Sequence, residues 1–160
     1  MNRNKGILIF SFLLIFFFPV SSQVPFITSE IGSEYYRGME LFNKEKYPAA
    51  IRLFDSFIRK GDKSDLILVA NAEYYRAVAS VRLYNPDAEF NMMMFIYNHP
   101  ESPRLNDARL ELGNYFYQSR NYRKAAIYFE TVNRQELKSD KLTEYFFRFG
   151  YSLYIKGDQS

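Results

Sequence analysis

Small and large apolar residues recur along the chain in one repeated order, with polar residues between them. Each copy predicts two amphipathic helices, because apolar residues fall three and four positions apart. The first helix of a copy has a small residue near its middle. The second begins with an alanine, and large apolar residues follow four and seven positions later. The central small residues are Gly38, Ala77, Gly113 and Gly150, and the second helices contain Ala50, Phe54 and Phe57, then Ala88, Met92 and Phe95, then Ala125, Phe129 and Val132.

The central small residues recur every 36 to 39 positions, a period that is typical of stacked helix pairs rather than of one closed globule. A lone helix pair cannot cover both of its sides. Stacking buries the shared sides, at about 25 cal/mol per Å² of apolar surface. We expect the glycines and alanines to let helix backbones approach closely, with Phe54 and Phe129 packed between them. The sequence therefore predicts an all-α fold, an α-α superhelix of antiparallel helix pairs, three complete and one half.

Turn-forming residues divide the chain into units. Gly61 ends the second helix, and two prolines between residues 98 and 103 exclude helix continuation there. The first helix is capped by Ser29 or Ser33 and ends at Glu45. The later helices cover about 47–60, 64–84, 86–97, 103–119, 123–132 and 139–156. The predicted domains are a lead-in at 23–32 and a repeat domain at 33–160, divided into units 33–63, 64–102, 103–138 and an incomplete 139–160.

The first 22 residues have the layout of a secretory signal peptide: the basic residues Arg3 and Lys5, an apolar run at 7–18, and small residues up to Ser22. The apolar run is shorter than the roughly 20 residues that span a bilayer as a helix. We expect cleavage after Ser22, or as a second choice after Gln23. The alternative is that the segment is an uncleaved membrane anchor. The chain has no cysteine, which excludes disulfides, thiolate chemistry and a lipid-modified cysteine. We expect an exported protein, periplasmic or associated with the outer membrane.

The residues that carry chemistry are few. His99 is the only histidine and lies in the proline-rich segment. The sequence has no glycine-rich phosphate loop and no histidine–carboxylate spacing that would hold a metal. Three successive residues on a helix point in three directions, so Met92, Met93 and Met94 cannot converge on an ion. The formal charge of +3 falls to +1 without Arg3 and Lys5, and the charges are interspersed, which disfavours nucleic-acid binding. We therefore expect no enzymatic activity, no cofactor and no metal.

The order of small, aromatic and apolar positions resembles the tetratricopeptide repeat family. The third copy matches it best, and the second departs from it, with Ala77 for a glycine and Asn85 for a tyrosine. The stretch from Phe95 to Glu130 is similar to periplasmic members of that family, namely the lipoprotein of the outer-membrane β-barrel assembly machine and the coordinator that works with the Tol-Pal system. The resemblance implies a non-enzymatic protein–protein interaction scaffold in the bacterial cell envelope. The matching residues are Leu112, Gly113, Phe116, Tyr122, Ala125, Phe129 and Val132, and in the first copy Gly38, Leu41, Tyr47, Ala50, Phe54 and Phe57.

In that family the first helix of each pair lines a concave groove, so the resemblance implies a groove that is aromatic and poor in charge. Such a groove suits an extended peptide or a helix of a partner protein. The alternative is that the same residues pack only against neighbouring helices. A clamp for a terminal carboxylate is not expected, because the position of its lysine is occupied by tyrosine, leucine or phenylalanine. The predicted groove residues are Tyr35, Met39, Phe42, Tyr74, Val78, Val81, Leu110, Asn114, Tyr117, Phe147, Tyr151 and Tyr154.

The last unit has a first helix without a second, which leaves an apolar face on Phe146, Phe149 and Leu153. Such a face usually indicates a missing partner or missing chain. This supports an alternative function, in which the chain is the N-terminal helical part of a larger envelope enzyme or of a transport or assembly system. Self-association through the incomplete repeat is a further expectation. Glycan binding has no support beyond the richness in tyrosine.

Overall fold

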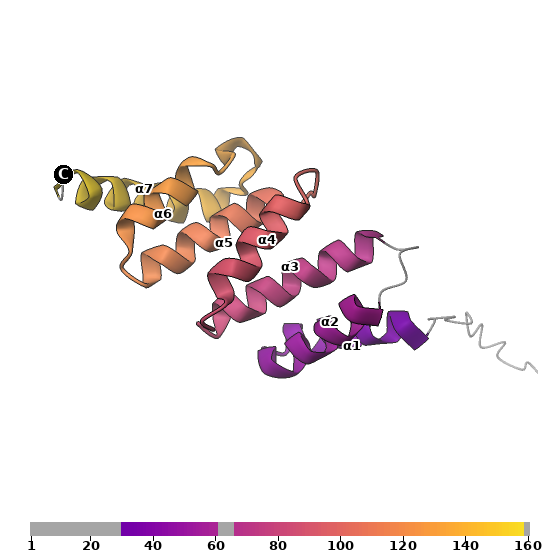
Figure 1. Ribbon diagram of the computed structural model, residues 1–160. Coiled ribbons are helices and arrows are strands. Elements are labelled where there is room, and N and C mark those ends of the chain that lie inside the picture. The colour runs from indigo at the N-terminus through magenta and orange to yellow at the C-terminus, as the bar shows by residue number, and fades with distance from the viewer. Residues whose placement is uncertain (1–29, 61–65, 159–160) are drawn as a thin grey trace, which may run out of the picture.

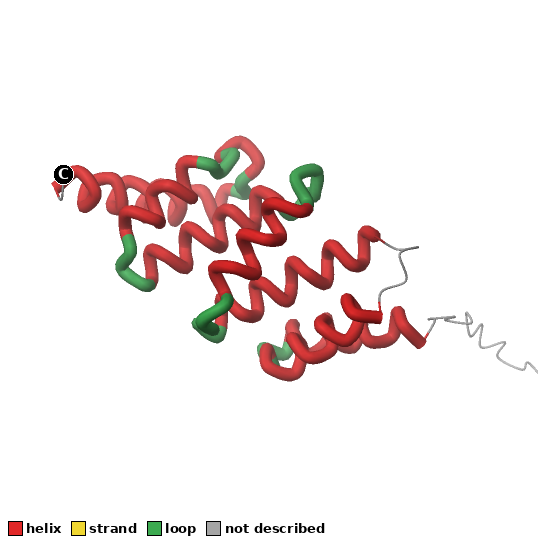
Figure 2. The backbone as a smooth tube through the Cα atoms, in the orientation of Figure 1, coloured by secondary structure: helices red, strands yellow, loops and turns green. Residues whose placement is uncertain are grey.

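The computed structural model describes residues 30–60 and 66–158, in which all regular secondary structure is helical (Figure 2). The prediction of an all-α fold is confirmed for these residues. The predicted signal peptide at 1–22 and residues 23–29 of the lead-in lie outside them. The elements are α1 (Glu30–Asn43), α2 (Tyr47–Lys60), α3 (Leu66–Arg82), α4 (Ala88–Asn98), α5 (Leu105–Gln118), α6 (Tyr122–Glu130), the short 3-10 helix η1 (Arg134–Glu136) and α7 (Ser139–Asp158).

The helix boundaries follow the sequence pattern closely. Helix α1 begins at Glu30, so residues 30–32 belong to the first helix and not to the lead-in. The other predicted ends lie within two residues of the observed ends. Apolar periodicity thus locates these helices well, because each one buries a face.

The helices stack in chain order along the molecule, from α1 and α2 at one end to α7 at the other (Figure 1). Each helix packs against the next, and α1, α3, α5 and α7 also pack successively against one another. Among the described residues, α2, α4 and α6 have at most sparse contacts with one another. The first helices of the pairs therefore form one closely spaced layer, and the second helices form the other.

On two glycines an aromatic ring of the following helix lies directly against the helix backbone, where the sequence analysis expects a close approach of two backbones. A Cβ atom built on Gly38 would lie 2.8 Å from Cε1 of Phe54, and one built on Gly113 would lie 2.6 Å from Cδ1 of Phe129. Both phenylalanines are fully buried. Real side-chain atoms essentially never approach so closely, so only glycine allows these rings to lie on the helix backbone.

Gly150 is the exception among the predicted packing residues. A Cβ atom built on it would meet nothing within 4 Å, and the residue is exposed. The prediction that Gly150 packs between helices is therefore wrong for the described residues, because none of their helices covers this face of α7. The alanines behave as predicted, since Ala50, Ala77, Ala88 and Ala125 are all completely buried.

The core has two parts that meet at α3. One part contains α1, α2 and the start of α3 around Phe54 and Phe57. The other extends from α3 to α7 around Met92, Leu112 and Phe129. Phe42 and Tyr75 contribute to both parts, and their rings meet edge to face with centroids 5.1 Å apart.

Three turns between paired helices share one backbone geometry. Glu45, Tyr84 and Arg120 each have a positive φ, of 56°, 52° and 59°. In each turn the next residue's N–H donates to a carbonyl five residues earlier, as Lys46 does to Leu41 at 2.9 Å and Asn121 to Phe116 at 2.8 Å. This is the Schellman arrangement that ends a helix. Each left-handed residue stands seven positions after the central small residue of its helix.

Candidate partner-binding site

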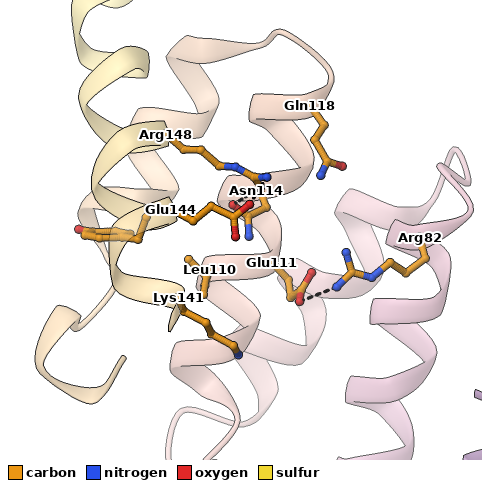
Figure 3. Close-up of a pocket in the computed structure, with 9 residues that line it drawn as sticks. Arg82, Leu110, Glu111, Asn114, Gln118, Lys141, Glu144 and Arg148 are labelled. Atoms are coloured by element: carbon orange, nitrogen blue, oxygen red, sulfur yellow. Dashed lines mark hydrogen bonds and ion pairs between the residues drawn. The ribbon is translucent and has the colours of Figure 1, made fainter. Parts of the chain in front are cut away.

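A polar hollow lies between α3, α5 and α7, on the layer of first helices (Figure 3). Its volume is about 250 Å³. Helix α5 contributes residues spaced three and four positions apart, and α7 contributes a second stripe of the same spacing, so two helix faces form facing walls. The lining residues are Arg82, Leu110, Glu111, Asn114, Gln118, Lys141, Glu144, Tyr145 and Arg148.

Ion pairs and hydrogen bonds hold the walls of this hollow in place. Arg82 donates to Oε1 of Glu111 at 2.8 Å, which links α3 to α5. Arg148 donates to Oδ1 of Asn114 at 2.9 Å and also pairs with Glu144. Lys141 pairs with Asp107 at 3.1 Å, just outside the lining. The donors and acceptors of the hollow are therefore ordered before any partner binds.

Glu111 is the less exposed of the two acidic residues that line the hollow. Burial raises the pKa of its carboxyl group, and the nearby Arg82 and Lys141 oppose that shift. While Oε1 accepts from Arg82, Oε2 is buried and has no hydrogen-bond partner among the described residues. A buried acceptor without a donor costs free energy, and this cost falls on the ionised form of Glu111.

Several predicted groove residues lie in the core. Tyr35, Tyr74, Val78 and Val81 are buried between helices, and Leu110 is buried beneath the hollow. Tyr35 packs against Phe54 and Phe57, and Tyr74 packs against Phe95. For these residues the alternative of packing between helices is correct. They lie on the side of each first helix that faces a neighbouring helix and not solvent.

The remaining predicted groove residues do not form one surface. Met39 and Phe42 pack at the edge of the core, whereas Asn114 lines the hollow. Tyr117 meets Tyr151 edge to face at 5.9 Å, and Arg148 lies over the Tyr117 ring at 5.4 Å. Phe147 stacks on Tyr151 with ring centroids 6.5 Å apart, and Phe147 and Tyr154 are both exposed. Two of the predicted groove residues, Leu110 and Asn114, line the hollow between the first helices, and that hollow is charged. The aromatic groove itself stays a prediction.

Sequence reasoning missed the charged residues of the hollow: Arg82, Glu111, Lys141, Glu144 and Arg148. None of them was singled out in the sequence. One pattern could have found them, because Asp107 and Lys141 are 34 positions apart, as are Asn114 and Arg148. Side chains of opposite charge, or a donor and an acceptor, that are separated by nearly one repeat period lie side by side on successive first helices.

The single histidine has a structural contact. Nε2 of His99 lies 2.5 Å from Oε2 of Glu73, and the ring packs against Phe95 at 5.1 Å between centroids. This contact links the end of α4 to α3. No group of three or more histidine, cysteine or acidic residues that could hold a metal gathers within residues 30–60 and 66–158. Within the same ranges, no helix combines the length and apolar character needed to cross a membrane.

Comparison of the chain with protein families, with curated proteins and with solved structures finds no match.

Proposed function

We propose that this chain is an exported, non-enzymatic scaffold of the tetratricopeptide type that binds a segment of another protein in the bacterial cell envelope. The repeated helix pairs support this proposal. Gly38 with Phe54 and Gly113 with Phe129 pack in the same register, and the first helices of the pairs contact one another in succession. Repeat architectures of this kind present an extended surface to partners.

The observation that carries the proposal is the polar hollow shared by three successive first helices. Its side chains offer both donors and acceptors, including Gln118, Lys141 and Glu144. Preordered polar groups fix the orientation of a bound segment and exclude segments that leave them unpaired. The partner is therefore a polar segment of mixed charge, rather than the apolar helix that an aromatic groove would bind.

Selection of binding peptides from a random displayed library tests this proposal. The bait is the chain without residues 1–22. The double variant Gln118→Ala and Lys141→Ala removes two of the more exposed lining groups and should weaken binding of the selected peptides about tenfold or more. Raising the salt concentration should weaken binding further, since the hollow is charged. The circular dichroism spectrum should not change.

The matched control is Lys44→Ala, which removes an exposed lysine of the α1–α2 turn that pairs with Glu40. This variant should bind the same peptides as well as the original chain. Selected peptides that bind the double variant unchanged would place the binding surface elsewhere. A library that yields no binder would contradict the proposed function.

Export is tested separately, because residues 1–22 lie outside the described residues. The full-length chain, expressed in a Gram-negative host, should be recovered from the periplasmic fraction with Gln23 as its first residue. Recovery from the membrane with Met1 or Asn2 as the first residue would instead support the retained anchor.

A further inference from the structure

Helix α4 has an apolar stripe that faces solvent. Positions 90, 93, 94 and 97 lie on one side of the helix, because they are three and four positions apart. The exposed fraction is 64% at Phe90 and 80% at Tyr97. It is 45% at Met93 and 37% at Met94. The other side of α4 is buried around Met92, so this helix has two apolar sides, and the described residues cover one of them.

The α4 stripe is not a general property of the second helices. Counted from the alanine near the start of each second helix, its positions are +2, +5, +6 and +9. In α6 the first two positions are Ile127 and Glu130, and α6 ends there. In α2 all four are polar, namely Arg52, Asp55, Ser56 and Arg59. Packing within the repeat therefore does not require apolar side chains here, which leaves the α4 stripe for a contact outside the described helices.

The order of side chains in the α4 stripe is the same in both directions. An aromatic ring stands at each end, and two methionines lie between the rings. When a second α4 lies antiparallel on the stripe, Phe90 of each copy meets Tyr97 of the other, and the methionines meet at the centre. Such reciprocal contacts are what a two-fold interface requires. Aromatic rings pair favourably edge to face or offset, and methionine adapts its shape to fill the gaps between them.

The charges around the α4 stripe disfavour a membrane surface as the occupant. Helix α4 has one charged residue, Glu89, which pairs with Lys124 of α6 at 2.7 Å. From residue 83 to residue 103 the sequence has no lysine or arginine, and it contains Asp87 and Glu101 as well as Glu89. Helices that lie on membranes have basic residues beside their apolar face, which attract anionic lipids. An acidic surrounding does not provide this attraction.

The size of the α4 stripe fits a weak dimer. A fully buried aromatic side chain covers about 150–250 Å², so the exposed parts of Phe90 and Tyr97 amount to about 300 Å² per copy. The methionines of both copies add to this area. The total lies at the low end of specific interfaces, at or below about 1,200 Å², where association is weak and reversible.

The α4 stripe and the polar hollow lie on different layers of the molecule. Helix α4 is the middle helix of the layer of second helices (Figure 1), whereas the hollow lies on the layer of first helices. A contact through α4 therefore leaves the hollow open.

We propose that the chain forms a two-fold dimer through the α4 stripe, with the two α4 helices antiparallel. The partner at this surface is a second copy of the chain. Because both hollows stay open, the dimer holds two partner segments at once. This last consequence rests on the proposed function, whereas the dimer itself does not.

Sedimentation velocity over a range of concentrations tests the dimer without any partner peptide, again with the chain that lacks residues 1–22. The dissociation constant should lie in the micromolar range, about 1–100 μM. Tyr97→Glu should raise it at least tenfold, because each copy then places a carboxylate against Phe90 of the other. Added salt should not weaken the dimer, since the contact is apolar. The matched control is Phe147→Glu, which changes a ring of similar exposure on α7 and should leave the constant unchanged.

Cysteine cross-linking tests the antiparallel register, and the chain has no cysteine of its own to interfere. Phe90→Cys and Tyr97→Cys chains are mixed and oxidised mildly. The mixed disulfide should exceed either like disulfide at least fivefold. Like cysteines lie seven positions apart along the paired helices, about 10 Å, and a disulfide requires Cα atoms within about 7 Å.

Three results would overturn the proposal. The first is a chain that stays monomeric at high micromolar concentration, including one that instead binds phosphatidylcholine vesicles through Tyr97. The second is a dimer that Phe147→Glu dissociates and Tyr97→Glu does not, which would assign self-association to α7. The third is like disulfides that form as readily as the mixed one.

Discussion

Helices α5 and α7 carry the same glycine-centred pattern in two different environments. On α5 the glycine is covered, and the ring of Phe129 lies directly on the backbone of Gly113. On α7 the glycine is open, and the residues around Gly150 are exposed. The comparison shows that the pattern specifies a surface able to pack against a helix. Whether that surface is buried depends on the neighbouring element.

The largest expected effect on stability distinguishes the buried ring of Phe129 from the exposed ring of Phe147. Phe129→Ala should lower the free energy of unfolding by about 3–5 kcal/mol, because it leaves a cavity between α5, α6 and α7. Phe147→Ala should change it by no more than about 0.5 kcal/mol, because the Phe147 ring is mostly in solvent. Urea denaturation of both variants measures the difference. Equal losses would show that the α7 face is packed in solution.

A smaller effect should distinguish the two faces of α7 itself. The hydroxyl of the buried Tyr145 donates to the carbonyl of Phe129 at 3.1 Å. Tyr145→Phe should therefore cost about 1 kcal/mol of stability, because a buried hydrogen bond between α7 and α6 is lost, although the N–H of Val132 still donates to that carbonyl. The matched change Tyr154→Phe on the open face should cost almost nothing. Thermal unfolding of the two variants checks this, and the prediction is wrong if Tyr154→Phe costs more.

The smallest effect concerns the buried acid of α5, at the register position where α7 has Arg148. Burial raises the pKa of Glu111. The folded state therefore keeps the carboxyl proton of Glu111 up to a higher pH than the unfolded chain does. The contribution of Glu111 to stability is thus complete below its ordinary value of 4.5 and falls as pH rises through the raised folded value. The stability of Glu111→Gln, relative to the original chain, should therefore improve as pH increases from 4.5 to 7. Urea denaturation across this range measures the change, and a constant difference between the two proteins would contradict it.

Much of the fold could be predicted from the sequence because each helix repeats its apolar positions with helical spacing. That Gly38, Phe54, Gly113 and Phe129 pack between helices was also predictable, since three aligned copies show which residues share a register, but the contact of each ring with a glycine comes from the structure. The three left-handed turns were not, because Glu45, Tyr84 and Arg120 are not glycines. Only the repeated backbone geometry reveals them.

The site was predicted less well, for a physical reason. Helical periodicity gives the angle of a residue around its own helix, but it does not say which flank meets a neighbouring helix. Tyr74 and Val78 therefore looked available to a partner and are buried. Glu111 and Arg148 were not singled out in the sequence, and they line the hollow. Their roles depend on contacts between helices about one repeat apart, which a single helix pattern does not contain.

The most direct test of the account is the effect of alanine at the two glycines. Gly113→Ala should lower the free energy of unfolding by about 1–3 kcal/mol, because its Cβ atom would meet the Phe129 ring at 2.6 Å. Gly150→Ala should raise it by about 0.5–1 kcal/mol, because alanine favours the helix and nothing lies within 4 Å. Changes of opposite sign in the free energy of unfolding would support a covered Gly113 and an open Gly150. The account is contradicted if both substitutions stabilise the chain or both destabilise it by similar amounts.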